Sequence, residues 1–251
     1  NGPAGTIGAA NAELREALVE KIRAQVEARP ELLSHVVPSY PFGGKRSLRD
    51  NGVWLKALQR ENVSLVTNPI TKIEPDAVVT ADGTRHKADV LIYGTGFEAS
   101  NFLKSFKVTG LNGQDLHTRW AGDARAYLGM CVPGFPNFFM IYGPNTNIVV
   151  NGSIIFLSEC AVSYISEAAR LIASTGPISV KQSVHDAFNA KVDAENAKMA
   201  WGQPGVTSWY KNRHGRVSQN WPFALVDYWQ ATRKPNPADF EPVNPRQAAA
   251  A

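Results

Sequence analysis

Ala-Asp-Val-Leu-Ile-Tyr-Gly-Thr-Gly-Phe, residues 88–97, is the stretch that decides the fold class. Its apolar run, residues 90–93, has the length of a strand buried on both faces of a sheet. Gly94-Thr95-Gly96 then lets the backbone turn sharply at the carboxyl end of that strand. In open α/β sheets ligands bind at these ends, because loops and backbone N–H groups converge there. By itself, the stretch fits an ordinary strand-to-loop turn equally well.

A second segment of the same design follows in the chain. Residues 138–142, Phe-Phe-Met-Ile-Tyr, again form an apolar run, and Gly143-Pro144-Asn145 comes directly after it. A helical pattern starts near Gly152. Two strand-then-glycine units, the second followed by a helix, predict an α/β fold with a cofactor-binding mixed sheet and flanking helices.

Composition restricts the class of protein. The 251 residues suffice for one large or two small domains, and 44% hydrophobic with 19% charged residues is typical of a folded globular chain. The net charge of +4 comes from scattered basic residues, so we expect no nucleic-acid partner. No apolar run approaches the roughly 18 residues of a membrane span, and no signal-peptide pattern opens the chain. We therefore expect no membrane partner and a cytoplasmic location. Cys131 and Cys160 lie in apolar stretches and predict buried thiols.

Periodicity and chain breakers predict the remaining elements. Apolar residues recur every four positions over residues 11–29, which is typical of an amphipathic helix that ends before Pro30. Asp82-Gly83 is a hairpin signal between two short strands. The proline-rich segment from Lys234 predicts a surface extension. Further helices are expected over 30–35, 51–60, 152–175, 183–199 and 222–233, and strands over 63–67, 70–74, 77–80 and 178–181.

The most informative polar stretch is the loop at residues 38–50. Its Gly43-Gly44 pair allows the backbone to approach a ligand closely, and Lys45, Arg46 and Arg49 supply positive charge. From composition alone, a solvated basic turn is the favoured interpretation.

These motifs together resemble the C-terminal half of a flavin-dependent Baeyer–Villiger monooxygenase. The resemblance runs collinearly from about Ala12 to about Phe240. Within the family, the 4-hydroxyacetophenone monooxygenases, which oxidise aryl ketones to aryl esters, are the most similar subgroup. The motifs that carry it are Pro-Ser-Tyr-Pro-Phe-Gly-Gly-Lys-Arg (38–46), Asp-Val-Leu-Ile-Tyr-Gly-Thr-Gly-Phe (89–97), Pro-Asn-Phe-Phe (136–139) and Gly-Pro-Asn (143–145).

The resemblance implies a division of the chain and a set of roles. Residues 1–87 would be the remainder of an NADPH-binding domain, and residues 88–251 the C-terminal part of an FAD-binding domain. Arg46 would be the catalytic arginine over the flavin, where it stabilises the negatively charged flavin peroxide and its adduct with the ketone. Lys45 would hold the 2′-phosphate of NADPH, and Trp209, in Ser-Trp-Tyr, would reach the NADP ribose. Further cofactor contacts are expected at Thr95, Gly96, Phe97, Gly143, Pro144 and Asn145, and no metal site is expected.

One family feature is missing from this sequence. The family's enzymes carry a G-x-G-x-x-G fingerprint for FAD and another for NADPH, and here no such motif follows a strand. We therefore expect the C-terminal part of a longer enzyme that is inactive alone and needs the N-terminal part to bind FAD and NADPH tightly. Its partners would be a ketone and O₂, and its assembly either a homodimer or an association with an N-terminal half.

Two alternatives stay open at this point. An N- or S-oxidising flavin monooxygenase shares the Gly-Thr-Gly turn, although Arg46 in its Gly-Gly-Lys-Arg context argues against that class. A stand-alone binding or scaffold domain without catalysis would also lack the two fingerprints.

Overall fold

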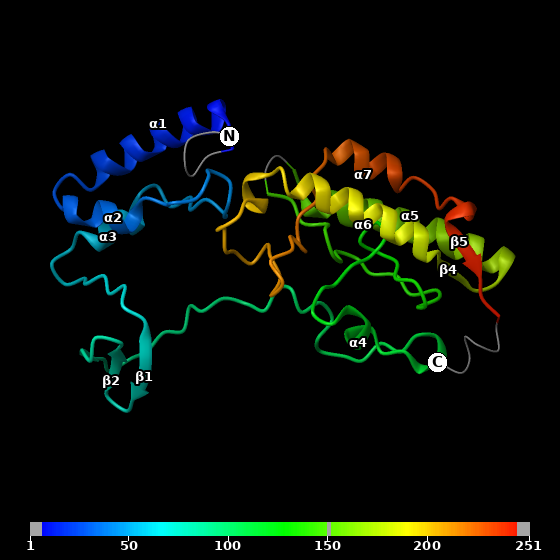
Figure 1. Ribbon diagram of the computed structural model, residues 1–251, viewed down its shortest axis with the longest axis horizontal. Coiled ribbons are helices and arrows are strands. Elements are labelled where there is room, and N and C mark those ends of the chain that lie inside the picture. The colour runs from blue at the N-terminus through cyan, green and yellow to red at the C-terminus, as the bar shows by residue number, and fades with distance from the viewer. Residues whose placement is uncertain (1–6, 150–151, 245–251) are drawn as a thin grey trace. The chain divides into compact units, whose positions relative to one another are not determined.

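The protein is described by a computed structural model that covers residues 7–149 and 152–244 (Figure 1). The chain divides into two compact units. The first unit comprises Asn1–Arg15, Ser39–Ser47 and Glu98–Ala251, and the second comprises Glu16–Pro38 and Leu48–Phe97. The expected division into an NADPH-binding domain (1–87) and part of an FAD-binding domain (88–251) stays a prediction.

The second unit combines short helices with a small antiparallel sheet. Its helical core gathers buried side chains at helical spacing, among them Val26, Leu55 and Leu58. The sheet has the order β1-β2-β3. The elements are α1 (Ala9–Gln25, which starts in the first unit), a 3-10 helix (Pro30–Leu32), α2 (Leu33–Val36), α3 (Val53–Leu58), β1 (Ile70–Glu74), β2 (Ala77–Thr80) and β3 (Arg85–Lys87).

The hairpin between β2 and β3 confirms the Asp-Gly turn. Gly83 adopts a φ of +82°, a conformation that favours glycine. The Asp82 carboxylate accepts hydrogen bonds from the Thr80 hydroxyl at 2.6 Å and from the Thr84 N–H at 3.1 Å. These bonds stabilise the charged form and lower the pKa of Asp82 to about 2. The turn is therefore closed by its own side chains.

The prediction of a buried strand at residues 90–93 is wrong for this structure. The segment is extended but belongs to no strand, and its apolar side chains are exposed, with Ile92 at 87% and Phe97 at 97%. A strand buried on both faces needs neighbouring strands for its backbone groups, and none of the described residues pairs with this segment. The strand expected over 63–67 is absent from this structure for the same reason.

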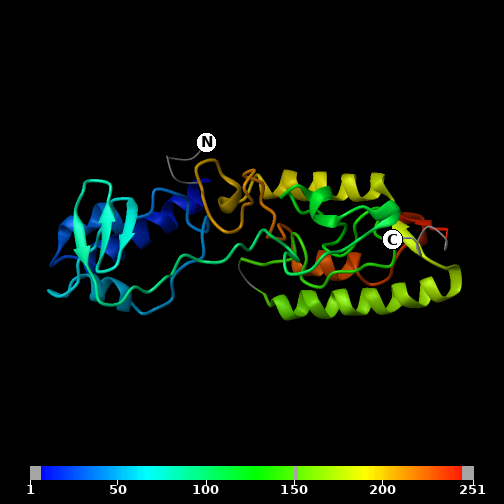
Figure 2. The same cartoon turned by 90° about the horizontal axis from the view of Figure 1, so that it is seen from below.

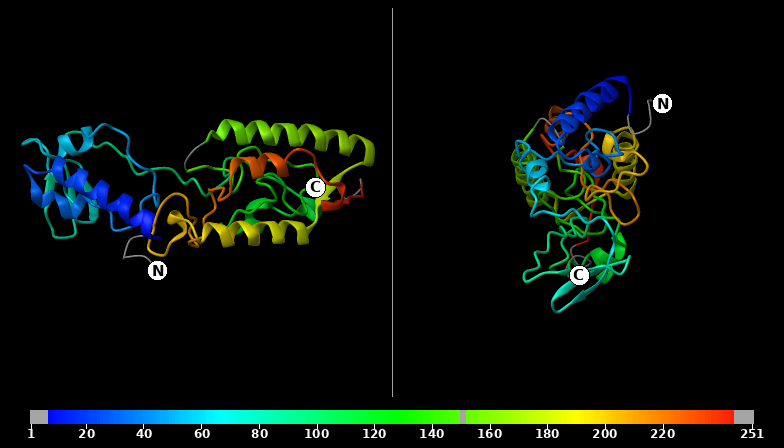
Figure 3. Two further views of the ribbon diagram at one scale, coloured as in Figure 1. Left: turned by 90° about the horizontal axis from the view of Figure 1, so that it is seen from above. Right: turned by 90° about the vertical axis from the view of Figure 1, so that its left-hand side faces the viewer.

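The first unit is built around two long helices, α5 (Ile154–Thr175) and α6 (Gln182–Asn196). They lie on opposite sides of the unit, with α7 (Leu225–Ala231) and irregular segments between them (Figure 2, Figure 3). Ser153 caps α5 by accepting the Ile155 N–H at 3.2 Å. The helices expected over 152–175, 183–199 and 222–233 are thus confirmed. Smaller helical elements are α4 (Leu116–Trp120) and 3-10 helices at Leu111–Gly113, Ala200–Gly202 and Pro237–Asp239.

The main core of this unit joins α5 to the irregular segment before it. Tyr164 packs with Met130 and with Cys131, whose thiol is buried, as is that of Cys160. Both thiols were predicted to be buried. The apolar run at 138–142 is not a strand, however. Met140 N–H bonds to Met130 O at 3.0 Å, and no partner strand runs beside the segment in the described part of the chain.

The proline-rich segment after Lys234 is partly structural, so the prediction of a surface extension is wrong there. Residues Phe240–Pro242 form β5, which pairs antiparallel with β4 (Ile178–Val180), and Phe240 is buried in the main core. One large apolar side chain in a polar stretch is sufficient to anchor it. The last part of the expected extension, residues 245–251, lies outside the described residues.

Candidate functional site

The basic loop of residues 39–47 is held in place by its glycine and by backbone contacts. A Cβ at Gly44 would lie 3.0 Å from the Pro41 carbonyl oxygen and 3.4 Å from Val206 Cγ1. A larger residue would therefore displace the loop from its contact with Val206. Asn11 donates its side-chain amide to the Phe42 carbonyl at 3.0 Å. Because the backbone is fixed in this way, the side chains that follow it start from a defined position.

The two cations of the loop have different surroundings. Lys45 Nζ lies 4.8 Å from the centre of the Tyr40 ring, a cation–π contact. Arg46 is exposed, and its charge acts on two tyrosines that are distant in sequence. Burial raises the pKa of Tyr142 and of Tyr210, and the Arg46 guanidinium opposes that rise at both phenols. Since such a force weakens with distance, Arg46, Tyr142 and Tyr210 form one group.

Tyr210 is the most unusual member of this group. The residue is 0% exposed, yet its hydroxyl has no hydrogen-bond partner among the described residues. A buried hydroxyl without a partner costs about 1–3 kcal/mol. Its neighbour Trp209 is 43% exposed, and the two rings are 4.6 Å apart. Trp209 therefore offers an accessible aromatic surface, and the covered Tyr210 hydroxyl beside it still lacks an acceptor.

The segment after Tyr142 forms a compact polar turn. Gly143 is required there, because a Cβ would lie 2.2 Å from the Gly129 carbonyl oxygen. Asn145 adopts a φ of +59° and donates its side-chain amide to Val217 O at 2.8 Å and to Asn220 O at 3.2 Å. Tyr142 donates its hydroxyl to Asn147 Oδ1 at 2.9 Å. The turn of residues 143–147 is thereby locked to the segment that follows Tyr210.

A partly buried charge network braces this turn. Arg216, whose side chain is 10% exposed, donates to Asn145 Oδ1 at 3.1 Å and to Asp193 Oδ1 at 3.1 Å, and it also pairs with Asp123. Arg125 bridges the same two carboxylates at 2.8 Å and 2.7 Å. Burial alone would raise the pKa of Asp123, but the hydrogen bonds and charges of the two arginines lower it below its ordinary value. No local pattern marks such a network, because its members come from four separate segments.

The structure places the predicted site residues in two groups. Six of them belong to the first unit: Lys45, Arg46, Gly143, Pro144, Asn145 and Trp209. Thr95, Gly96 and Phe97 belong to the second unit, in the exposed segment that precedes Glu98. The cofactor-binding and catalytic roles of all nine remain predictions.

His117 contacts the backbone of the segment that precedes α4. Its Nε2 lies 3.2 Å from the Phe106 carbonyl oxygen. No cluster of three or more potential metal ligands occurs within residues 7–149 and 152–244. In the same ranges, no helix is both long enough and apolar enough to cross a membrane.

Comparison with known proteins identifies relatives that are named as monooxygenases. No protein-family model matches the chain. An uncharacterized monooxygenase, y4iD, of Sinorhizobium fredii is 35% identical over 241 residues, which is 95% of this chain and 36% of that protein. The FAD-binding monooxygenase ktnD of Aspergillus niger is 35% identical over 227 residues (88% and 37%). A Baeyer–Villiger monooxygenase of Streptomyces coelicolor is 29% identical over 222 residues (87% and 42%).

Solved structures agree with these relatives. An oxidized steroid monooxygenase bound to NADP is 27% identical with a TM-score of 0.74, over 89% of this chain and 42% of that one. Cyclohexanone monooxygenase from Rhodococcus sp. Phi1, bound to NADP⁺, is 25% identical with a TM-score of 0.71, over 89% of this chain and 42% of that one. The chain is similar in sequence and fold to part of the Baeyer–Villiger monooxygenases. It spans less than half the length of these relatives. The α/β fold class is confirmed.

Proposed function

We propose that this chain is the C-terminal part of an NADPH- and O₂-dependent flavin monooxygenase that inserts oxygen beside a ketone carbonyl to give an ester. The observation that carries the proposal is the group formed by Arg46, Tyr142 and Tyr210, next to the turn of residues 143–147. Relatives with FAD-binding or Baeyer–Villiger in their names, and similar structures that bind NADP, support it.

The residues present fit such a cofactor. Gly143 leaves room for no side chain at the turn, and the buried Tyr210 hydroxyl still needs an acceptor. Bound FAD, reduced by NADPH, would supply the activated oxygen. Arg46 would bind the negative charge that develops on the ketone oxygen, since guanidinium stays charged at any working pH and donates in a fixed plane. Lys45 would hold the 2′-phosphate of NADPH.

An exposed aromatic surface at this group supports an aryl substrate. Trp209 and Tyr142 are both partly exposed, and their rings can pack against an aryl group. An aryl ketone, as in the 4-hydroxyacetophenone monooxygenases, is therefore the substrate that we propose. N- and S-oxidation form no adduct with a carbonyl, so an enzyme of that class would not need an arginine to stabilise one.

The assembly that we propose is an association with an N-terminal part that carries both dinucleotide fingerprints. The exposed apolar segment 90–97 supports this, because strands that pair beside it and helices that pack on its faces would remove Val90, Ile92 and Phe97 from water. We also propose that the chain by itself is catalytically inactive. Co-purification with an N-terminal part expressed from the encoding gene tests the association, and a stable homodimer in its place would contradict it.

The activity is tested with the full product of the encoding gene. With NADPH and an aryl methyl ketone such as 4-hydroxyacetophenone, we expect the aryl ester to form in proportion to the NADPH consumed. A sulfide and an amine serve as competing substrates. If these are oxidised while no ketone yields an ester, an N- or S-oxidising enzyme is the correct class. If no substrate is oxidised by flavin-loaded protein, the chain belongs to a non-catalytic protein.

A further inference from the structure

The proposed function does not use a pocket of the first unit that lies beside α4. Ten residues line it: Ser100, Asn101, Phe102, Lys104, His117, Trp120, Ala121, Gly122, Ala124 and Arg213. Its volume is about 330 Å³, at the lower end of the roughly 300–1,000 Å³ found for small-molecule sites. All ten residues belong to one compact unit, so its walls hold together without the second unit.

The charges of the lining have one sign. Lys104 and Arg213 are the basic residues of the lining, and none of the ten lining residues is a carboxylate. Glu98, just outside the pocket, pairs with Lys104. Both side chains of that pair are 67% exposed, and exposed pairs of this kind contribute only about 0–1 kcal/mol. The Lys104 ammonium has two further N–H groups, so the pair leaves it available to an anion.

The guanidinium of Arg213 is only partly used in hydrogen bonds to the described residues. Its Nη2 donates to the Ala121 carbonyl, and its Nε donates to His214 Nε2 at 3.2 Å. These two bonds hold the side chain against α4, while Nη1 and the second N–H of Nη2 stay unpaired among the described residues. Two parallel N–H groups at one edge of a guanidinium match the two oxygens of a carboxylate.

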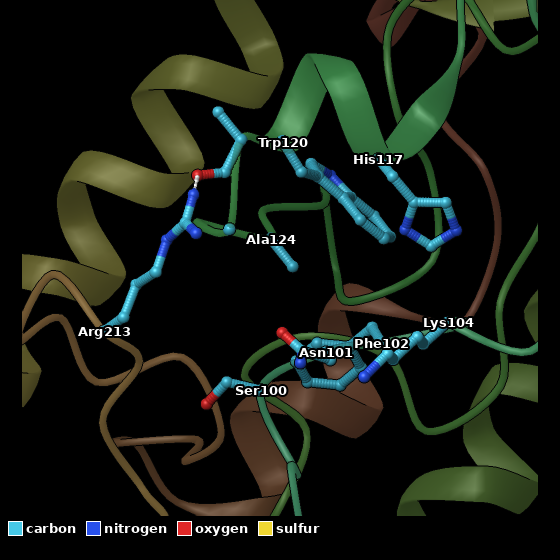
Figure 4. Close-up of a pocket in the computed structure, with 10 residues that line it drawn as sticks. Ser100, Asn101, Phe102, Lys104, His117, Trp120, Ala124 and Arg213 are labelled. Atoms are coloured by element: carbon cyan, nitrogen blue, oxygen red, sulfur yellow. Dashed lines mark hydrogen bonds between the residues drawn. The ribbon is translucent and has the colours of Figure 1, made fainter.

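Three aromatic side chains also line the pocket (Figure 4). Trp120 and His117 project from α4, with their rings 6.2 Å apart, and Phe102 lies on the opposite side together with Ser100, Asn101 and Lys104. Trp120 donates its indole N–H to Arg125 O at 3.0 Å, so only the ring surface of Trp120 faces the pocket. Such rings favour a planar aromatic ligand over a small inorganic anion.

We propose that the pocket between α4, residues 100–104 and Arg213 is a binding site for a small aromatic carboxylate. The carboxylate binds the free guanidinium edge of Arg213, the ring packs against Trp120 and Phe102, and Lys104 adds positive charge at the far end of the pocket. This site shares no residue with the group around Arg46, so it is separate from the proposed oxygenase site.

Isothermal titration of the purified chain with three probes tests the chemistry of the site. Benzoate carries both the charge and the ring, benzamide keeps the ring without the charge, and acetate keeps the charge without the ring. We expect saturable benzoate binding with a Kd on the order of 1 mM, as is typical of a very small ligand in an open pocket. Benzamide and acetate should each bind at least ~10-fold more weakly. Equal binding of benzoate and benzamide, or no saturable binding of benzoate, refutes the proposal.

Variants locate the binding. Lys104→Gln and Arg213→Gln should each raise the benzoate Kd at least ~3-fold, and the double variant ~10-fold, since each removes one partly solvated charge. Lys107→Gln, an exposed lysine outside the lining, is the matched control and should leave the Kd unchanged. If the control weakens binding as much as the pocket variants, benzoate binds to general surface charge and the proposal fails. FAD and NADPH are not needed, so the result is independent of the proposed oxygenase activity.

Discussion

Replacing Arg216 by methionine should destabilise the first unit strongly while the side-chain volume is largely kept. Arg216 is 10% exposed and binds Asp123, Asp193, Asn145 and the Ala124 carbonyl. Removing one partner of a fully buried ion pair costs about 3–5 kcal/mol, because a charge is left unpaired, and the lower end applies here because the side chains of Asp123 and Asp193 are 28% and 29% exposed. Arg125 still bridges both carboxylates, which reduces that cost. We therefore expect a loss of about 3 kcal/mol in the free energy of unfolding.

Urea unfolding followed by circular dichroism measures this loss. Arg170→Met is the matched control, because Arg170 lies on α5 with a side chain that is 72% exposed and pairs with Glu167. The control should lose less than about 0.5 kcal/mol. If Arg216→Met also loses less than about 1 kcal/mol, the network does not brace the unit and the reasoning is wrong.

The same network predicts a pH dependence. The pKa of Asp123 is lowered in the folded protein, so this carboxylate binds fewer protons when folded than when unfolded. Its stabilising contribution is full above the unfolded pKa of about 3.9 and is lost as the pH falls through the lower folded value. The difference in the free energy of unfolding between the unsubstituted chain and the Arg216→Met variant should therefore become smaller as the pH falls below about 4.

Three further predictions concern the group around Arg46. In the flavin-loaded full product of the encoding gene, Arg46→Lys should lower the amount of ester formed per NADPH consumed, and Arg46→Ala should lower it further, while NADPH is still consumed. An unchanged ratio for Arg46→Ala would show that Arg46 is only a surface cation. Tyr210→Phe should leave urea stability unchanged or raise it by about 1 kcal/mol, because it removes an unpaired buried hydroxyl; the same variant should weaken cofactor binding, and a clear loss of stability would show that the hydroxyl has a partner. Trp209→Ala should alter NADPH use or ketone preference with little loss of stability, since the residue is only half-buried; a loss of ~3–5 kcal/mol, as for a core aromatic, would show that the tryptophan is structural.

Local patterns in the sequence determined the helices and the hairpin. The apolar spacing of α5 and α6 and the turn residues Asp82-Gly83 act over a few neighbouring positions, so the sequence sufficed to predict them. The similarity to the Baeyer–Villiger monooxygenases was also visible in short motifs, and the relatives agree with it.

Long-range contacts were decided only by the tertiary structure. The apolar run at 90–93 predicted a strand, but a strand forms only where another strand pairs with it, and no described residue does so. Phe240 pairs with Val180 across the sheet formed by β4 and β5, although its own neighbours indicated a surface tail. The proximity of Arg46 to Tyr142 and Tyr210, and the network around Arg216, likewise join segments that are distant in sequence. Such contacts depend on how the chain packs, because the atoms that meet are brought together by many other contacts and not by their own spacing along the chain.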